Sequence, residues 1–236
     1  MAAIIGIYGK SGSGKTSLIE WLIHKLKKNG ASIATIKHTR KKVSLDKKGK
    51  DSWRHREAGS QLTSLVSPIG TNYLLGEEKN LEQILEDIKK ISDPDLILVE
   101  GYKDEIIPSI AVGDIRKRKG TFFRYRGDRE KALEEIKEEM KLQGIKSQLG
   151  GLDCGECGFP NCRTLAKKIM KGEKEITDCP VINKDEVKMS VNGEPIALKG
   201  FIQQMIKNTF LGMISSLKGI DKNVEEVTLN INNSKE

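Results

Sequence analysis

The first residues of the chain that could do chemistry form a glycine-rich loop ending in Lys15-Thr16. Residues 9–16 read G-K-S-G-S-G-K-T and match G-x-x-x-x-G-K-[ST], the spacing of a phosphate-binding P-loop. Glycines let successive backbone N–H groups turn into one cavity that holds the α- and β-phosphates. The Lys15 ammonium group would hold the β- and γ-phosphates, and the Thr16 hydroxyl would ligate Mg²⁺. The expected nucleotide contacts are Gly9, Lys10, Ser11, Gly12, Ser13, Gly14, Lys15 and Thr16.

The sequence around this loop has the order that a P-loop requires. Residues 4–8 form a short apolar run, as expected of a buried strand. An amphipathic helix follows, because Leu18, Leu22 and Leu26 share one stripe, and Gly30 would end it. The phosphates would lie at the N-terminus of this helix, where unpaired N–H groups and the helix dipole favour negative charge. A ligand-free turn rich in glycine and serine is the alternative, and the strand–loop–helix order argues against it.

The carboxylate of Glu100 is the second group with a predicted chemical role. Four apolar residues, 96–99, precede it, which is the pattern of a Walker B strand whose acid lies beside the Mg²⁺ site. A surface glutamate at the end of a strand is the alternative, but ligand sites of parallel sheets form at the carboxyl ends of strands. We therefore predict Lys15 and Glu100 as catalytic residues, with Thr16 and Glu100 at the magnesium ion.

All four cysteines lie within one short segment and have the spacing C-x2-C-x4-C-x16-C-P. Three close thiolates can surround one face of a cubane cluster, and a fourth that arrives beyond a short helix completes four-cysteine ligation. Four thiolates also suit tetrahedral zinc, although a structural zinc site usually pairs two C-x2-C turns and the second is missing here. A redox-active dithiol is a further alternative. The predicted ligands of a [4Fe–4S] cluster are Cys154, Cys157, Cys162 and Cys179.

Strands and helices alternate over the part of the chain that would position the P-loop and Glu100. Besides the two elements that flank the P-loop, strands are expected at residues 32–38, 62–67, 71–75, 95–102, 107–112 and 122–125. Helices are expected at residues 51–59, 80–91 and 128–142, the last ended by Gln143-Gly144. This alternation predicts an α/β P-loop domain with a mostly parallel sheet.

The end of the chain predicts a smaller unit of mixed structure. A hairpin is expected around Asn192-Gly193, then a helix at 201–217 and a final strand at 227–231. The expected organisation is therefore a P-loop domain at 1–145, a four-cysteine iron–sulfur domain at 146–184 and a small α+β segment at 185–236.

Composition limits the classes of function. The formal charge of the 236-residue chain is +8, but the basic residues are spread over many segments without a nucleic-acid-binding motif, so nucleic acid is not an expected partner. The sequence has neither a signal peptide nor an apolar stretch of membrane-spanning length, so we expect a soluble, cytoplasmic protein. In that compartment, grouped cysteines indicate a metal site rather than disulfides.

Residues 37–56 form a strongly basic stretch with two open interpretations. Its cations could close over phosphates as a lid, or they could belong to a solvated loop. His38 and His55 could contact a ligand or be ordinary surface histidines. The residues alone do not decide between these interpretations.

Four segments of the first 145 residues together resemble the MobB family of molybdopterin-guanine dinucleotide biosynthesis adaptor proteins. They are the P-loop and residues 35–38 (T-I-K-H), 49–59 (G-K-D-S-W-R-H-R-E-A-G) and 98–103 (L-V-E-G-Y-K). The third segment is the most distinctive. The chain departs from the family pattern at 40–48, which is rich in lysine where the family often has histidine.

The resemblance implies a GTP-binding protein, commonly a homodimer, that hydrolyses GTP weakly. Such a protein assists a guanylyltransferase-type enzyme that joins GMP to a molybdenum or tungsten pterin cofactor. The expected cofactors are GTP, Mg²⁺ and the [4Fe–4S] cluster, and the expected partners are that enzyme and the pterin.

The cysteine segment, residues 148–182, is similar to the small iron–sulfur domain of Rnf-type electron-transport subunits and of corrinoid iron–sulfur proteins. Such domains transfer electrons, sense redox state or brace a fold.

Two other functions of the whole protein remain possible from the sequence. One is a nucleotide-gated iron–sulfur electron-transfer protein, and the other is a P-loop phosphotransferase with the basic stretch as its lid.

Overall fold

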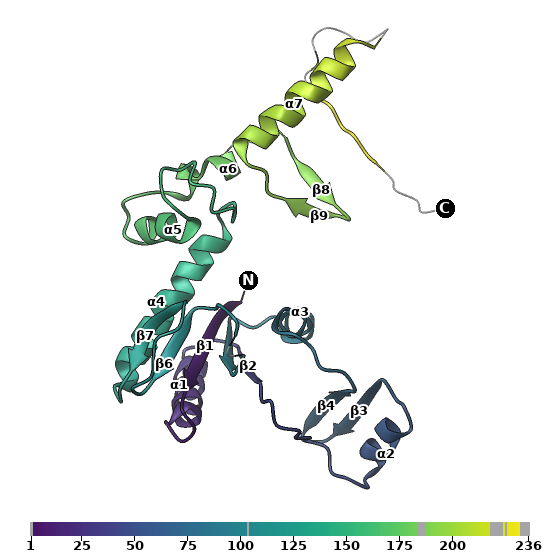
Figure 1. Cartoon of the computed structure of the whole chain (residues 1–236), viewed down its shortest axis with the longest axis vertical. Helices are drawn as coiled ribbons and strands as arrows, with labels where there is room; N and C mark the ends of the chain where they lie inside the picture. The colour runs from purple at the N-terminus through teal and green to yellow at the C-terminus, as the bar shows by residue number, and fades with distance from the viewer. Residues whose placement is uncertain (1, 103, 184–186, 218–223, 225, 232–236) are drawn as a thin grey trace. The chain divides into compact units, whose positions relative to one another are not determined.

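The structure is a computed structural model that describes residues 2–102, 104–183, 187–217, 224 and 226–231 (Figure 1). The chain divides into two compact units, Met1–Gly144 and Ile145–Glu236. Each unit is described by itself below. The expected boundary between an iron–sulfur domain and a C-terminal segment, at 184/185, lies outside the described residues and stays a prediction.

The first unit is built on a five-stranded parallel sheet, as the alternation of strands and helices predicted. In the sheet the strands follow the order β2-β5-β1-β6-β7. Their bounds are β1 Ala3–Gly9, β2 Ile33–Lys37, β5 Leu96–Glu100, β6 Ser109–Val112 and β7 Thr121–Tyr125. A parallel sheet must be covered on both faces, and the helices that connect its strands provide the cover.

Helices α1 (Lys15–Lys28) and α4 (Arg129–Ser147) cover one face of this sheet, and α3 (Leu81–Ser92) covers the other (Figure 1). Alternate residues of the central strands supply the two cores. Leu96 and Leu98 pack with the first face, whereas Ile97 and Val99 pack with α3. All five residues of β5 are buried, which is why its sequence is a continuous apolar run that ends in one carboxylate.

The expected end of α4 at Gln143-Gly144 is wrong, because the helix continues to Ser147. Glycine inside a helix costs only about 1 kcal/mol relative to alanine, so a tertiary contact can override it. Gln143 supplies that contact. Its side-chain amide donates to the Ile4 carbonyl oxygen at 3.0 Å and accepts from the Ile4 N–H at 2.9 Å, which holds this turn of the helix against β1.

A short helix and a hairpin form a separate part of the first unit. Helix α2 (Asp51–Glu57) leads into the antiparallel strands β3 (Leu62–Ser67) and β4 (Gly70–Leu75), which pair only with each other among the described residues. All three elements were predicted.

The second unit contains α5 (Cys162–Met170), a 3₁₀ turn η1 (Ile176–Asp178), α6 (Pro180–Asn183), the hairpin β8 (Met189–Val191) and β9 (Glu194–Ile196), and α7 (Gly200–Ser215). The hairpin and the last helix confirm the prediction. The expected strand at 227–231 is wrong, since these residues are exposed and have no regular structure. Alternating apolar residues give a strand only when a neighbouring strand pairs with their backbone. No described helix has the length and apolar character of a membrane span.

Candidate functional site

The register of the parallel sheet places the predicted catalytic elements at one edge. Ile7 of β1 and Lys37 of β2 both pair with Glu100, and Gly9 pairs with Val112 of β6. The glycine-rich loop leaves this carboxyl edge directly from Gly9. The edge therefore combines the start of the P-loop with the carboxylate that the sequence singled out.

The glycines of the P-loop have the backbone that phosphate cradling requires. Gly12 and Gly14 have φ angles of 72° and 87°, in the left-handed region that favours glycine. The Ser13 N–H donates to the Lys10 carbonyl oxygen at 3.3 Å, which closes the turn. The Leu18 N–H then donates to the Gly14 carbonyl oxygen at 3.0 Å and begins α1. The loop thus presents the N-terminus of a helix, a site that favours phosphate.

Two observations test whether this loop fits a phosphate ligand. A Cβ on Gly9 would lie 2.7 Å from both the Ser13 Oγ and the Val112 carbonyl oxygen, so the chain approaches itself there as only glycine allows. The Ser13 Oγ is buried and has no hydrogen-bond partner among the described residues. A buried hydroxyl of this kind calls for a partner, and a phosphate oxygen is one. The Lys15 ammonium group crosses the loop and donates to the Lys10 carbonyl oxygen at 2.6 Å. The loop therefore fits a phosphate.

Glu100 is 9% exposed and forms an ion pair with Lys37 on the neighbouring strand. The His38 N–H donates to the Glu100 carbonyl oxygen at 2.8 Å and extends the pairing of β2 and β5 by one residue. Thr16 lies exposed in the first turn of α1. Binding of one Mg²⁺ ion by Thr16 and Glu100 remains a prediction, and so do the catalytic roles of Lys15 and Glu100.

The chain turns sharply after Glu100, and this turn contains a residue that sequence reasoning gave no role of its own. Gly101 and Tyr102 have φ angles of 114° and 41°, and the latter is rare for a bulky residue. The Tyr102 ring stacks on the His38 ring with centroids 4.3 Å apart. Its hydroxyl donates to the Lys79 carbonyl oxygen at 3.1 Å. Burial raises the pKa of Tyr102, as do the nearby carboxylates Glu78 and Glu105. The neighbouring Lys103 lies outside the described residues.

Ion pairs hold parts of the basic stretch 37–56. Besides Lys37, the Arg40 guanidinium pairs with Asp104 at 2.8 Å, and Arg56 pairs with Asp46 at 3.3 Å. Asp46 also accepts from the Ser52 hydroxyl at 2.8 Å. His38 belongs to the stack on Tyr102, whereas His55 is exposed. A lid function for the stretch stays a hypothesis.

In the second unit, the four cysteines are free thiols on a loop and beside short helices. Cys162 and Cys179 are buried, and Cys154 and Cys157 are half-buried. Gly155 and Gly158 have positive φ angles of 79° and 81° and lie in the C-x2-C-G turn. The Gly158 N–H closes that turn by donating to the Gly155 carbonyl oxygen at 2.9 Å. Cys162 begins α5, and Cys179 directly precedes α6.

Asp153 ties this loop to α5. Its carboxylate accepts from the Cys162 N–H at 2.7 Å, and this backbone hydrogen bond lowers the pKa of Asp153. Burial raises the pKa of the Cys162 thiol. Within the described ranges, no three histidine, cysteine, aspartate or glutamate side chains are grouped so that they could hold a metal ion. The donor set of four thiols suits an iron–sulfur cluster in its chemistry. Their assembly around one remains a proposal.

Comparison with known proteins decides the family. The family model described as "Molybdopterin guanine dinucleotide synthesis protein B" (MobB) matches residues 4–133, more than half of the chain. The chain belongs to the MobB family. The resemblance inferred from the four sequence motifs is thereby confirmed. Membership of this family supports nucleotide binding by the first unit.

A full-length relative shares both units. It is the "Putative molybdopterin-guanine dinucleotide biosynthesis adapter protein" of Methanocaldococcus jannaschii, 32% identical over 246 residues, which cover 98% of each chain. The "Molybdopterin-guanine dinucleotide biosynthesis adapter protein" of Haemophilus influenzae is 38% identical over 119 residues, covering 45% of this chain and 61% of its own. The similarity to the Haemophilus protein thus covers about half of this chain, whereas the similarity to the Methanocaldococcus protein includes the cysteine segment and the residues after it.

A second family model, described as "Putative Fe-S cluster", matches residues 149–181 and contains all four cysteines. One subunit of the ion-translocating oxidoreductase complex of Thiobacillus denitrificans is 51% identical over 44 residues, which cover 19% of this chain and 23% of that protein. The expected similarity to ion-translocating electron-transport subunits is therefore confirmed. These matches support iron–sulfur binding by the second unit.

The turn after Glu100 gives a prediction on stability. A Cβ at position 101 would lie 2.6 Å from the His38 carbonyl oxygen, and the φ of 114° strains any other residue. We expect Gly101→Ala to lower the free energy of unfolding by about 1–3 kcal/mol in urea titrations. Gly113→Ala is the matched control, since its φ is 78° and its Cβ would meet open space. Equal losses in the two variants would show that the close approach of His38 imposes no constraint.

Proposed function

We propose that this MobB-family protein binds Mg-GTP in the P-loop of its first unit and acts as an adaptor for a guanylyltransferase-type enzyme. That enzyme would join GMP to a molybdenum or tungsten pterin. The observation that carries the proposal is the phosphate cradle at Gly9–Thr16, formed in a chain that belongs to this family. Lys15 would hold the β- and γ-phosphates, Thr16 would ligate Mg²⁺, and Glu100 would lie beside that ion.

The ion pair between Glu100 and Lys37 is consistent with weak hydrolysis of GTP. The carboxylate already has a cation partner in Lys37, so it must exchange that partner before it can orient a water molecule. An adaptor needs bound nucleotide rather than fast turnover. The free thiols also favour work in the cytoplasm, where cysteines stay reduced.

Nucleotide titration tests the P-loop assignment. We expect GTP to bind more tightly than ATP, and Lys15→Met to weaken GTP binding by about 30-fold or more, since truncating one partner of a charge pair costs about 2–5 kcal/mol. Isothermal titration calorimetry with and without Mg²⁺ would measure both effects. Lys90→Met, at an exposed lysine in the last turn of α3, is the charge-matched control and should bind GTP normally. Preference for ATP would refute the GTP assignment.

We propose that the four cysteines of the second unit hold one [4Fe–4S] cluster. When bound, the cluster would supply a one-electron couple or a structural brace. The chain contributes four thiolates, and two positive-φ glycines let the backbone of the C-x2-C-G turn approach the cluster sulfurs. The hydrogen bond between Asp153 and the Cys162 N–H holds the third ligand at the start of α5.

Anaerobic purification followed by iron and acid-labile sulfide analysis tests this proposal. We expect about four irons and four sulfides per chain. Cys157→Ser should lose most of both while its GTP affinity stays normal, which would show that the first unit still folds. One zinc ion per chain in place of iron would overturn the cluster assignment.

We also propose that the protein is a homodimer that uses the β3–β4 hairpin. An isolated two-stranded hairpin is marginally stable, and its unpaired edges offer backbone groups to another strand. The two strands of the hairpin expose five large apolar side chains, and such exposure marks interaction surfaces. They are Leu62, Leu65, Val66, Tyr73 and Leu75.

Sedimentation velocity tests the dimer. We expect the purified chain to sediment as a dimer and Val66→Lys to shift it toward the monomer. Val66 is 72% exposed, and Val43→Lys is the matched control because Val43 is 70% exposed outside the hairpin. A monomeric parent protein, or equal dissociation of both variants, would contradict the proposal.

A further inference from the structure

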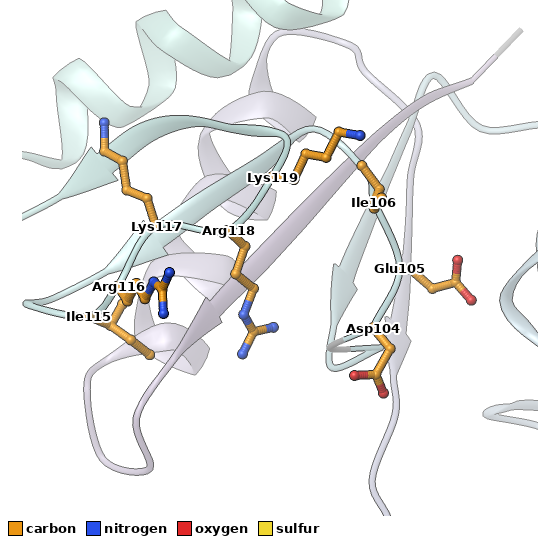
Figure 2. A pocket seen from close by; sticks show the side chains of 8 residues that line it. All are labelled: Asp104, Glu105, Ile106, Ile115, Arg116, Lys117, Arg118 and Lys119. Atoms are coloured by element: carbon orange, nitrogen blue, oxygen red, sulfur yellow. The ribbon is translucent and has the colours of Figure 1, made fainter.

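The first unit contains a pocket that none of the four family motifs explains. It lies between residues 104–106, which follow the turn after β5, and residues 115–119, which connect β6 to β7 (Figure 2). Its volume is about 490 Å³, within the range of small-molecule sites. Four consecutive cations line it, Arg116, Lys117, Arg118 and Lys119, together with the carboxylates of Asp104 and Glu105.

Residues 115–119 form the basic wall of this pocket, and hydrogen bonds fix this wall to the central strand β1. The Arg118 N–H donates to the Tyr8 hydroxyl at 2.9 Å, and the Arg118 guanidinium lies 4.4 Å from the centroid of the Tyr8 ring. The Tyr8 and Thr121 hydroxyl groups share a hydrogen bond of 2.7 Å. Tyr8 is the residue before Gly9, so the anchor of the basic wall adjoins the start of the P-loop.

The charges of the pocket favour an anion. Arg116, Lys117 and Lys119 form no ion pair with any acidic residue in the described ranges, although they are neighbours in sequence and repel one another. On the opposite side, Asp104 already pairs with Arg40 in an exposed contact that contributes little. A bound phosphate would relieve the repulsion within the basic wall.

The side chains also suggest how a ligand would be oriented. Figure 2 shows the guanidinium groups of Arg116 and Arg118 extending to the same side of the pocket as the Asp104 carboxylate, while Lys117 points away. Guanidinium groups bind phosphate through pairs of parallel hydrogen bonds. A smaller hollow shares Glu105, Arg118 and Lys119 with the pocket and continues to Tyr102. The site thus offers cations for a phosphate and carboxylates for N–H donors.

We propose that this pocket binds a phosphate monoester attached to a ring whose edge offers adjacent N–H donors. Guanine and pterin rings share that 2-amino-4-oxo edge, and we assign the pocket to the phosphorylated pterin. The assignment rests on the proposed function, in which the P-loop holds GTP, so that the pterin phosphate would lie beside the nucleotide. Arg116 and Arg118 bind the phosphate, and the Asp104 carboxylate accepts from the ring.

The test uses the full chain, purified anaerobically, with Mg²⁺ and a saturating non-hydrolysable GTP analogue to fill the P-loop. The probe is 6-hydroxymethylpterin phosphate, whose own fluorescence reports binding by anisotropy. The ligand controls are the unphosphorylated pterin, measured in the same way, and GMP, measured as a competitor that displaces the fluorescent probe. We expect the phosphorylated pterin to bind at least about tenfold more tightly than either, and Arg116→Gln with Arg118→Gln to remove that advantage. Lys89→Gln with Lys90→Gln, at two exposed lysines in the last turn of α3, is the charge-matched control and should keep it.

Three results would overturn the assignment. They are equal binding of the phosphorylated and unphosphorylated pterins, tighter binding of GMP than of the pterin phosphate, and equal losses in the two double variants. The first two are measured on the unmodified chain and do not depend on how a variant folds. GTP affinity is measured on the same preparations before the analogue is added. If GTP fails to bind while the pterin phosphate binds as expected, the proposed function fails and the pocket assignment stands.

Discussion

The parallel pairing of β1 with β5 and β6 is the constraint on which the rest of the first unit depends. Because these strands run in one direction, their carboxyl ends meet at one edge, and the sequence needs only a glycine-rich loop after one strand and a carboxylate at the end of another to build a nucleotide site there. β2 adds Lys37 to the same edge through its register with Glu100. A slip of one residue would turn Glu100 to the opposite face of the sheet and separate it from this edge.

Close packing behind this edge links the nucleotide site to its surroundings. Gly101 lets the chain pass against the backbone of His38, and the His38–Tyr102 stack then joins the end of β2 to the turn after β5. Tyr8, the residue before the P-loop, anchors the basic segment 115–119. The strand ends that hold the P-loop therefore also hold the turn after Glu100 and the basic wall. If a bound nucleotide moved the turn after Glu100, residues 104–106, which form the side of the pocket facing the basic segment, would move with it.

Most elements of the first unit could be predicted because their signals are local. The positive φ angles of the P-loop require glycines at fixed positions, and the burial of β5 on both faces requires a continuous apolar run, so both elements leave a pattern in the sequence. The features that escaped prediction depend on tertiary contacts. Gln143 holds α4 past a glycine that local propensity favours as its end, and residues 227–231 alternate like a strand but have no regular structure. The Tyr102 stack and the basic pocket join segments distant in sequence, so no local pattern indicates them.

The most direct test of the central claim, that this chain is a GTP-dependent adaptor, is a reconstituted synthesis of molybdopterin guanine dinucleotide. A guanylyltransferase from the same organism would be assayed with molybdopterin and GTP, with and without the chain, and the dinucleotide would be quantified by chromatography. The account predicts a higher yield with the chain and no gain with its Lys15→Met variant. An equal gain from that variant would contradict the role of the P-loop, and no gain from the unmodified chain would contradict the adaptor function itself.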